Sequence, residues 1–136
     1  MYPRGTTTAV HALSHVSDLL GMVAQRTTWH RRLSDDDGTQ RLLVPSWDFA
    51  ALLSQAVTQP RAYGGADPDV AGRLFAVLAE VAWHADAPAQ QSAVGRERDL
   101  LVAQCDGDLP AGWAPADVRR RGEAVDSALA RDWPHP

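Results

Sequence analysis

The stretch Gln59-Pro60-Arg61-Ala62-Tyr63-Gly64-Gly65-Ala66-Asp67-Pro68 separates two amphipathic helical patterns and so sets the architecture of the chain. The helix before it is expected to open at Pro45 and Ser46, with Ser46 as its N-cap. Pro60 disfavours helical geometry at the residue before it, so this helix is predicted to end at Gln59 or to kink there.

The second half of the stretch is a helix entry, in which Asp67 is the capping residue and a proline follows it. The two glycines supply backbone freedom for a hinge. Their N–H groups could bind an anion with help from Arg61, but the charge of Asp67 competes with an anion. The alternative is structural: Gly64 ends a helix, Arg61 bonds to carbonyl oxygens and Tyr63 packs. Arg61, Tyr63, Gly64 and Asp67 are therefore interaction candidates, with the structural role favoured.

Apolar residues elsewhere recur every three or four positions, which is the helical period. Two short apolar runs instead flank an Asp-Gly turn signal, as in a β-hairpin. Two strands alone are marginal, so this hairpin is expected to pack on helices. The prediction is a mainly α fold of about five amphipathic helices with one short β-hairpin between the first and second helix. The helices are expected at Thr6 to about Arg26, Ser46 to Gln59, Pro68 to about Ala85, Pro88 to before Gly107, and Pro115 to about Arg131, with strands at Trp29–Leu33 and Arg41–Val44.

Composition predicts one soluble domain over residues 1–136, with a lead at 1–5 and an irregular tail at 132–136. The net charge of −4 argues against nucleic-acid binding, and Arg119–Arg121 point around most of a helix circumference instead of forming one patch. No apolar run reaches the length that spans a bilayer, and no signal peptide is evident. The lone Cys105 excludes an intramolecular disulfide and fits a cytoplasmic location.

His11 and His15 are four residues apart on the first predicted helix, and Asp18 lies one turn further on. Two imidazoles and a carboxylate on one face could hold a divalent metal, which makes a small metal-dependent or ligand-binding enzyme the alternative function. The outer faces of amphipathic helices produce such pairs by chance, so the structural interpretation is favoured. Cys105 is expected to be unreactive, because a helix C-terminus and nearby aspartates disfavour a thiolate. No nucleophile elbow or phosphate loop is present, and no cofactor is expected.

The five tryptophans divide into two groups. Trp29, Trp47 and Trp83 fall in or beside predicted elements and could form a cluster that joins the hairpin to the helices. Trp113 is expected to dock back on the helices from its loop, whereas Trp133 could equally dock or wait for a partner.

Taken in order, these elements resemble the soluble C-terminal region of a bacterial family of predicted membrane proteins, domain of unknown function 2254. The resemblance covers roughly residues 5 to 130, and the family's Gln-x-Arg-x-Tyr-Gly pattern is matched at a helix end. The residues that carry it are Thr7-Thr8-Ala9-Val10, Leu13, Asp18-Leu19-Leu20, the hairpin, Val44-Pro45-Ser46-Trp47, Leu52-Leu53, Gln59, and Arg61-Ala62-Tyr63-Gly64.

The resemblance implies that membrane-spanning helices precede this domain in its relatives. Two positions depart from the family: Arg4-Gly5-Thr6 replaces an Asn-Asp-Pro-containing entry, and Pro60 replaces an apolar residue. The resemblance brings no assigned activity, so we expect a non-enzymatic regulatory or interaction domain on the cytoplasmic side. Its partners would be another protein or its own membrane-spanning region, through the hairpin and the Arg61–Asp67 junction. Alanine-rich helical faces can also self-associate, although no sequence feature demands a homo-oligomer.

Overall fold

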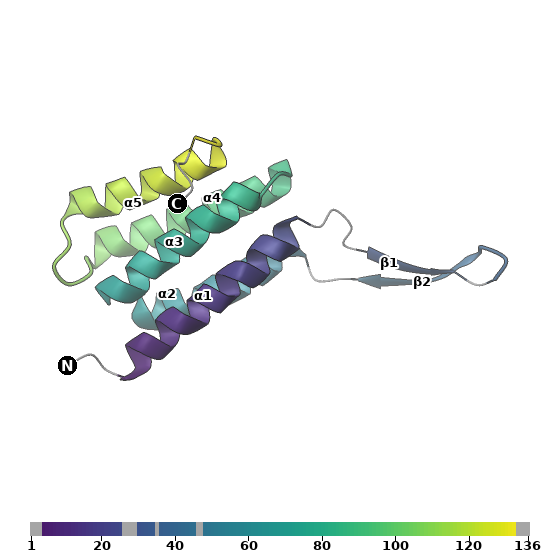
Figure 1. Cartoon of the computed structure of the whole chain (residues 1–136), viewed down its shortest axis with the longest axis horizontal. Helices are drawn as coiled ribbons and strands as arrows, with labels where there is room; N and C mark the ends of the chain where they lie inside the picture. Colours follow the sequence, from purple (N-terminus) through teal and green to yellow (C-terminus); the bar gives the residue numbers. More distant parts are fainter. Residues whose placement is uncertain (1–3, 26–29, 35, 46–47, 133–136) are drawn as a thin grey trace.

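The protein is mainly α-helical in the computed structural model, which describes residues 4–25, 30–34, 36–45 and 48–132. Five helices pack together, and a pair of strands extends from one end of them (Figure 1). The elements are α1 (Arg4–Ala24), β1 (His30–Ser34), β2 (Gln40–Pro45), α2 (Phe49–Gly64), α3 (Pro68–His84), α4 (Pro88–Gly107) and α5 (Pro115–Leu129).

Local sequence signals place the starts of the last three helices. Pro68, Pro88 and Pro115 each occupy the first turn of a helix, where a missing N–H costs nothing and the fixed φ is already helical. Asp67 caps α3, and Asp117 reaches back from the first turn of α5 to the N–H just before that helix. These three predicted starts are confirmed.

The second helix differs from its prediction at its C-terminal end. Pro60 lies inside α2, which continues to Gly64, so the predicted end at Gln59 is wrong and the alternative, in which Gly64 ends the helix, is confirmed. Proline removes one intrahelical hydrogen bond but keeps a helical φ. The helix beyond it is held by α4, as described below. The predicted cap Ser46 lies outside the described residues, and the first helical turn closes from the Leu52 N–H to the Asp48 carbonyl.

The two strands pair antiparallel, from His30 opposite Pro45 to Leu33 opposite Leu42, with a register shift before Ser34. They extend away from the helices (Figure 1), so the expectation that they pack on the helices is wrong. The helix-forming part of the chain therefore builds its core without them.

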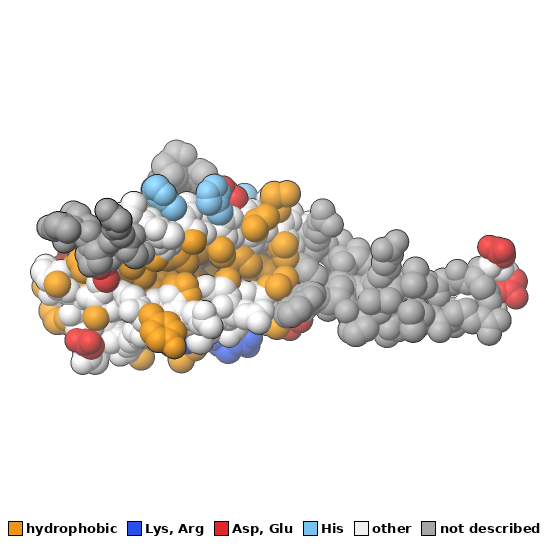
Figure 2. Space-filling view, turned by 90° about the horizontal axis from the view of Figure 1, so that it is seen from below, with side chains coloured by type: hydrophobic (Ala, Val, Ile, Leu, Met, Phe, Trp, Pro, Cys, Tyr) orange, Lys and Arg blue, Asp and Glu red, His pale blue; other side chains and the backbone are white. Residues whose placement is uncertain are grey.

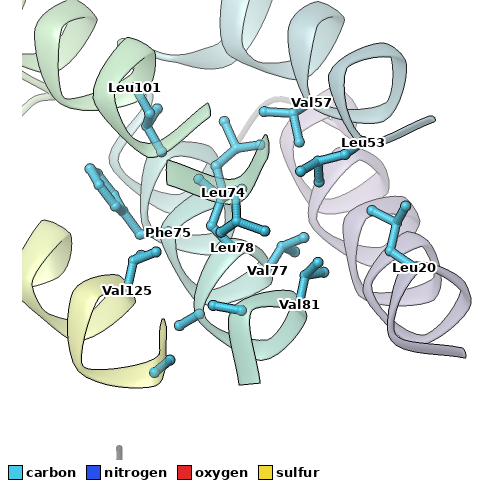
Figure 3. Packing of buried hydrophobic residues seen from close by; sticks show 14 of the residues in the cluster. Leu20, Leu53, Val57, Leu74, Phe75, Val77, Leu78, Val81, Leu101 and Val125 are labelled. Atoms are coloured by element: carbon cyan, nitrogen blue, oxygen red, sulfur yellow. The ribbon is translucent and has the colours of Figure 1, made fainter. Parts of the chain in front are cut away.

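Helix α3 is the centre of that core. Its buried face includes Leu74, Phe75, Val77, Leu78 and Val81, and Figure 3 shows these side chains surrounded by α1, α2, α4 and α5. The other helices contribute one apolar face each. The fully buried leucines and valines they add include Leu53, Val57, Val94, Leu101, Val118 and Val125.

Candidate functional site

The α2–α3 junction is held in place from α4. The Gln104 side-chain amide donates a hydrogen bond to the Arg61 carbonyl oxygen at 2.7 Å, and the Gly65 N–H donates to the same oxygen at 3.0 Å. These two bonds satisfy a carbonyl that would otherwise be unpaired at a helix C-terminus. The Arg61 guanidinium Nε is buried and has no hydrogen-bond partner among the described residues. Arg61 therefore stabilises the junction through its backbone.

The glycine pair serves close packing and not backbone freedom. Gly65 has φ −64°, and the described glycines with positive φ are Gly38 and Gly112. A Cβ on Gly64 would lie 2.7 Å from a Val70 methyl group. A Cβ on Gly65 would lie 2.5 Å from the Arg61 carbonyl oxygen, and closer still to the Gln104 amide. The predicted hinge is wrong: these positions lack room for a side chain.

Asp67 caps α3 as predicted. Its Oδ1 accepts hydrogen bonds from the N–H groups of Asp69 at 2.9 Å and Val70 at 3.3 Å. Two of the orphan donors at this helix start are thereby occupied, next to a carboxylate charge. This arrangement weighs against an anion at the junction.

Tyr63 is the residue whose environment differs most from expectation. Its side chain is 90% exposed, so the prediction that it packs against the junction is wrong. Gln59 and Ala62, beside it on α2, are exposed as well. A fully exposed tyrosine presents both a ring and a hydroxyl, a combination that is enriched in protein interfaces.

The histidines of α1 point to solvent. His11, His15 and Asp18 are all exposed. Within the described ranges, no three side chains of histidine, cysteine, aspartate or glutamate lie close enough to hold a metal ion. The structure therefore does not bring the side chains of His11, His15 and Asp18 together as a metal site.

A polar seam between α1 and α3 escaped the sequence reasoning. The Ser17 hydroxyl donates to a Glu80 carboxylate oxygen, and the other oxygen of Glu80 lies 3.8 Å from Arg73. One turn further along, His84 Nδ1 lies 3.4 Å from the Gln25 side-chain amide. The sequence feature that could have indicated this seam is Ser17, a polar residue at a buried position in an otherwise apolar stripe of α1. Its partner is 63 residues away, so periodicity could not identify it.

Two other predictions can be compared with the structure. Cys105 is fully buried, and burial, followed by the charge of Asp106, raises the pKa of its thiol. Trp113 docks on the helices as expected, 6.3 Å from the Phe75 ring and beneath the Arg121 guanidinium at 4.3 Å. Trp29, Trp47 and Trp133 lie outside the described residues.

Charge is distributed unevenly over the helices. Helix α4 carries five charged residues and α5 carries six, whereas α1 and α2 together carry Arg4, Asp18 and Arg61. On the face formed by α1 and α2, hydrophobic side chains run along the body as a band (Figure 2). Leu19 of α1 is 61% exposed, whereas Met22 is 60% exposed but borders Glu80 and His84 of α3. Charge depletion with exposed aliphatic and aromatic side chains is typical of the core of an interface. We call this surface the α1–α2 face.

The described helices include none that is both long enough and apolar enough to cross a membrane. A family model described as Predicted membrane protein (DUF2254) matches residues 5–80. The match spans α1, both strands, α2 and most of α3, and therefore includes the whole α1–α2 face. No curated protein and no solved structure matches the chain.

Proposed function

Because the chain belongs to the predicted membrane protein family DUF2254, we propose that it is a non-catalytic regulatory or interaction domain on the cytoplasmic side of such a protein. Its contact surface is the α1–α2 face, with Tyr63 at the C-terminal end of α2 as an anchor. The partner is another protein surface or the membrane-associated part of a related chain.

The observation that carries this proposal is the combination of low charge and exposed hydrophobic side chains on one face. Tyr63, Leu19 and Met22 are the three most exposed large hydrophobic side chains of the described residues, and all three lie on α1 or α2. Leu19 and Tyr63 lie toward opposite ends of the α1–α2 pair, because the two helices run in opposite directions (Figure 1). The charge-poor surface between them carries further apolar side chains, and such a surface indicates a contact.

The enzyme alternative lacks an observation in its favour. Catalysis needs titratable groups that converge on one reacting atom. His11 and His15 are instead exposed on α1, and Cys105 is buried with a raised thiol pKa. The Ser17 hydroxyl donates to the Glu80 carboxylate, but Ser17 is only 3% exposed, so a substrate could not reach this hydroxyl. The polar seam is therefore a packing contact between α1 and α3.

Site-specific photocrosslinking tests the proposal. A photoreactive phenylalanine analogue replaces Tyr63 in the chain expressed in its native cell, and a matched variant carries the analogue at Leu100, a 46% exposed residue of α4. Because neither side chain belongs to the core, both variants are expected to fold. The expected result is a discrete crosslinked product from position 63 and none from position 100. Equal crosslinking at both positions, or none at either, would contradict the proposal.

A further inference from the structure

The apolar side chains of the α1–α2 face lie along the contact between the two helices. On α1, Ala12 and Leu19 are exposed and Val16 is partly buried; on α2, Leu52 and Ala56 are partly buried. Spacings of three, four and seven residues place each set on one side of its helix. The two sets flank the line along which α1 and α2 meet, which is where Figure 2 shows the hydrophobic band.

We propose that this face packs against the same face of a second copy of the chain, in a two-fold symmetric dimer. The inference rests on the proposed function, because it names the partner of that contact surface. In a two-fold contact both copies use the same patch, so the side chains of the face must be compatible with the same side chains on the other copy.

Charge is the first reason to choose a second copy. The chain carries a net charge of −4, so two copies repel each other over most of their surfaces. The charged side chains that the structure describes on α1 and α2 are Asp18, which borders Glu80 and His84 of α3, and Arg61, whose carbonyl oxygen is bonded from α4. When two copies meet through the α1–α2 face, they do not bring an excess of like charges together. A partner recruited by electrostatic attraction would instead require a charged patch, which this face lacks.

The size of the face is the second reason. Helix α1 has 21 residues and α2 has 16, so at 1.5 Å per residue the shared length is about 24 Å. Two neighbouring helices with their side chains cover a width of about 20 Å. The footprint is therefore about 500 Å² on each copy, or about 1,000 Å² in total. This value lies at the lower limit for a specific interface and predicts a weak, concentration-dependent dimer.

A substitution at Leu19 is the most direct test of the proposed dimer. It is 61% exposed in the isolated chain, so Leu19→Glu leaves the core intact while placing two carboxylates, one from each copy, in an apolar contact. We expect this change to weaken the dimer at least about 100-fold. The matched control is Leu100→Glu on α4, which adds the same charge at a 46% exposed leucine outside the face.

Sedimentation equilibrium over a wide concentration range measures the association. Wild type and Leu100→Glu are expected to rise from the monomer mass of 14.7 kDa toward twice that value, while Leu19→Glu stays monomeric. A wild type that is monomeric throughout, or a dimer that Leu19→Glu leaves unchanged, overturns the inference. Circular dichroism of all three proteins excludes loss of folding as the cause.

Cysteine crosslinking locates the contact independently. Because Cys105 is fully buried, a cysteine introduced at Ala12 is the accessible thiol among the described residues. Ala12→Cys is expected to give an oxidised, disulfide-linked dimer, and Leu100→Cys is expected not to. Equal yields from both overturn the inference. A monomeric chain whose position 63 crosslinks to a different protein would overturn the dimer and leave the proposed function standing; failure of both experiments would overturn both.

Discussion

Replacing Gly65 with alanine tests the reasoning about how the α2–α3 junction is held. The backbone of Gly65, with φ −64° and ψ −21°, suits alanine as well as glycine. Backbone conformation alone therefore favours the substitution by about 0.4–1 kcal/mol, because alanine restricts the unfolded chain. Any destabilisation must come from the space around the new methyl group.

That space is occupied by two groups. The Arg61 carbonyl oxygen would lie 2.5 Å from the methyl carbon, and relieving this contact requires a backbone shift. The Gln104 amide must also move, which breaks its 2.7 Å hydrogen bond to Arg61. Overpacking costs about 1–3 kcal/mol, and the hydrogen bond contributes about 1 kcal/mol. After the gain from alanine, a net loss of about 2 kcal/mol remains.

Urea unfolding followed by circular dichroism measures this loss, provided that the slope of the free energy of unfolding against urea concentration is the same in both proteins. Gly95→Ala in α4 is the matched control, because a Cβ there meets no atom within 4 Å. The same substitution should stabilise the protein by about 0.5–1 kcal/mol at that helix-interior position. Gln104→Ala removes the hydrogen bond to Arg61 without adding a methyl group at position 65. It should lower the free energy of unfolding by about 1 kcal/mol. If Gly65→Ala were as stable as wild type, the close approach of α4 to this junction would be refuted.

Three further outcomes follow from single side chains. Asp67→Ala should lower the free energy of unfolding by about 1 kcal/mol, measured by urea unfolding, because α3 loses its N-cap. Cys105 should react with a thiol reagent only after denaturation, since the group is buried and its thiol pKa is raised; rapid labelling of the native protein would contradict this. The hydrogen bond from the Ala114 N–H is the first cause that lowers the pKa of Asp117. The stability advantage of wild type over Asp117→Asn should therefore be full above the ordinary pKa of 3.8 and disappear as the pH falls through the lowered value, which urea midpoints across pH measure.

The sequence predicted those parts of the fold that depend on neighbours in the chain. The starts of α3, α4 and α5 follow from Pro68, Pro88 and Pro115, since proline and a nearby capping group act within a single turn. The apolar period likewise located all five helices to within a few residues at most ends. Local signals of this kind need no knowledge of the tertiary structure.

Local signals pointed to two different ends of α2, Gln59 and Gly64, and could not decide between them. Pro60 favoured an early end, but the last turn is stabilised by Gln104, which lies 43 residues further along the chain. The same residue explains why position 65 excludes a side chain. The exposure of Tyr63 is also a tertiary property, because the helical period places it beside partly buried residues and only the packing of α1 against α2 decides whether it is covered.

The uneven distribution of charge, in contrast, is visible in the sequence, but only the fold shows which surface lacks charge. Charged residues are dense in α4 and α5 and sparse in α1 and α2, which is visible from the chain alone. The structure adds that α1 and α2 lie side by side and turn one common surface outward (Figures 1 and 2). A surface that only had to remain in water would carry interspersed charges, as α4 and α5 do. Leu19 and Tyr63 remain exposed where such charges are missing, and this supports the proposal that the α1–α2 face makes the contact.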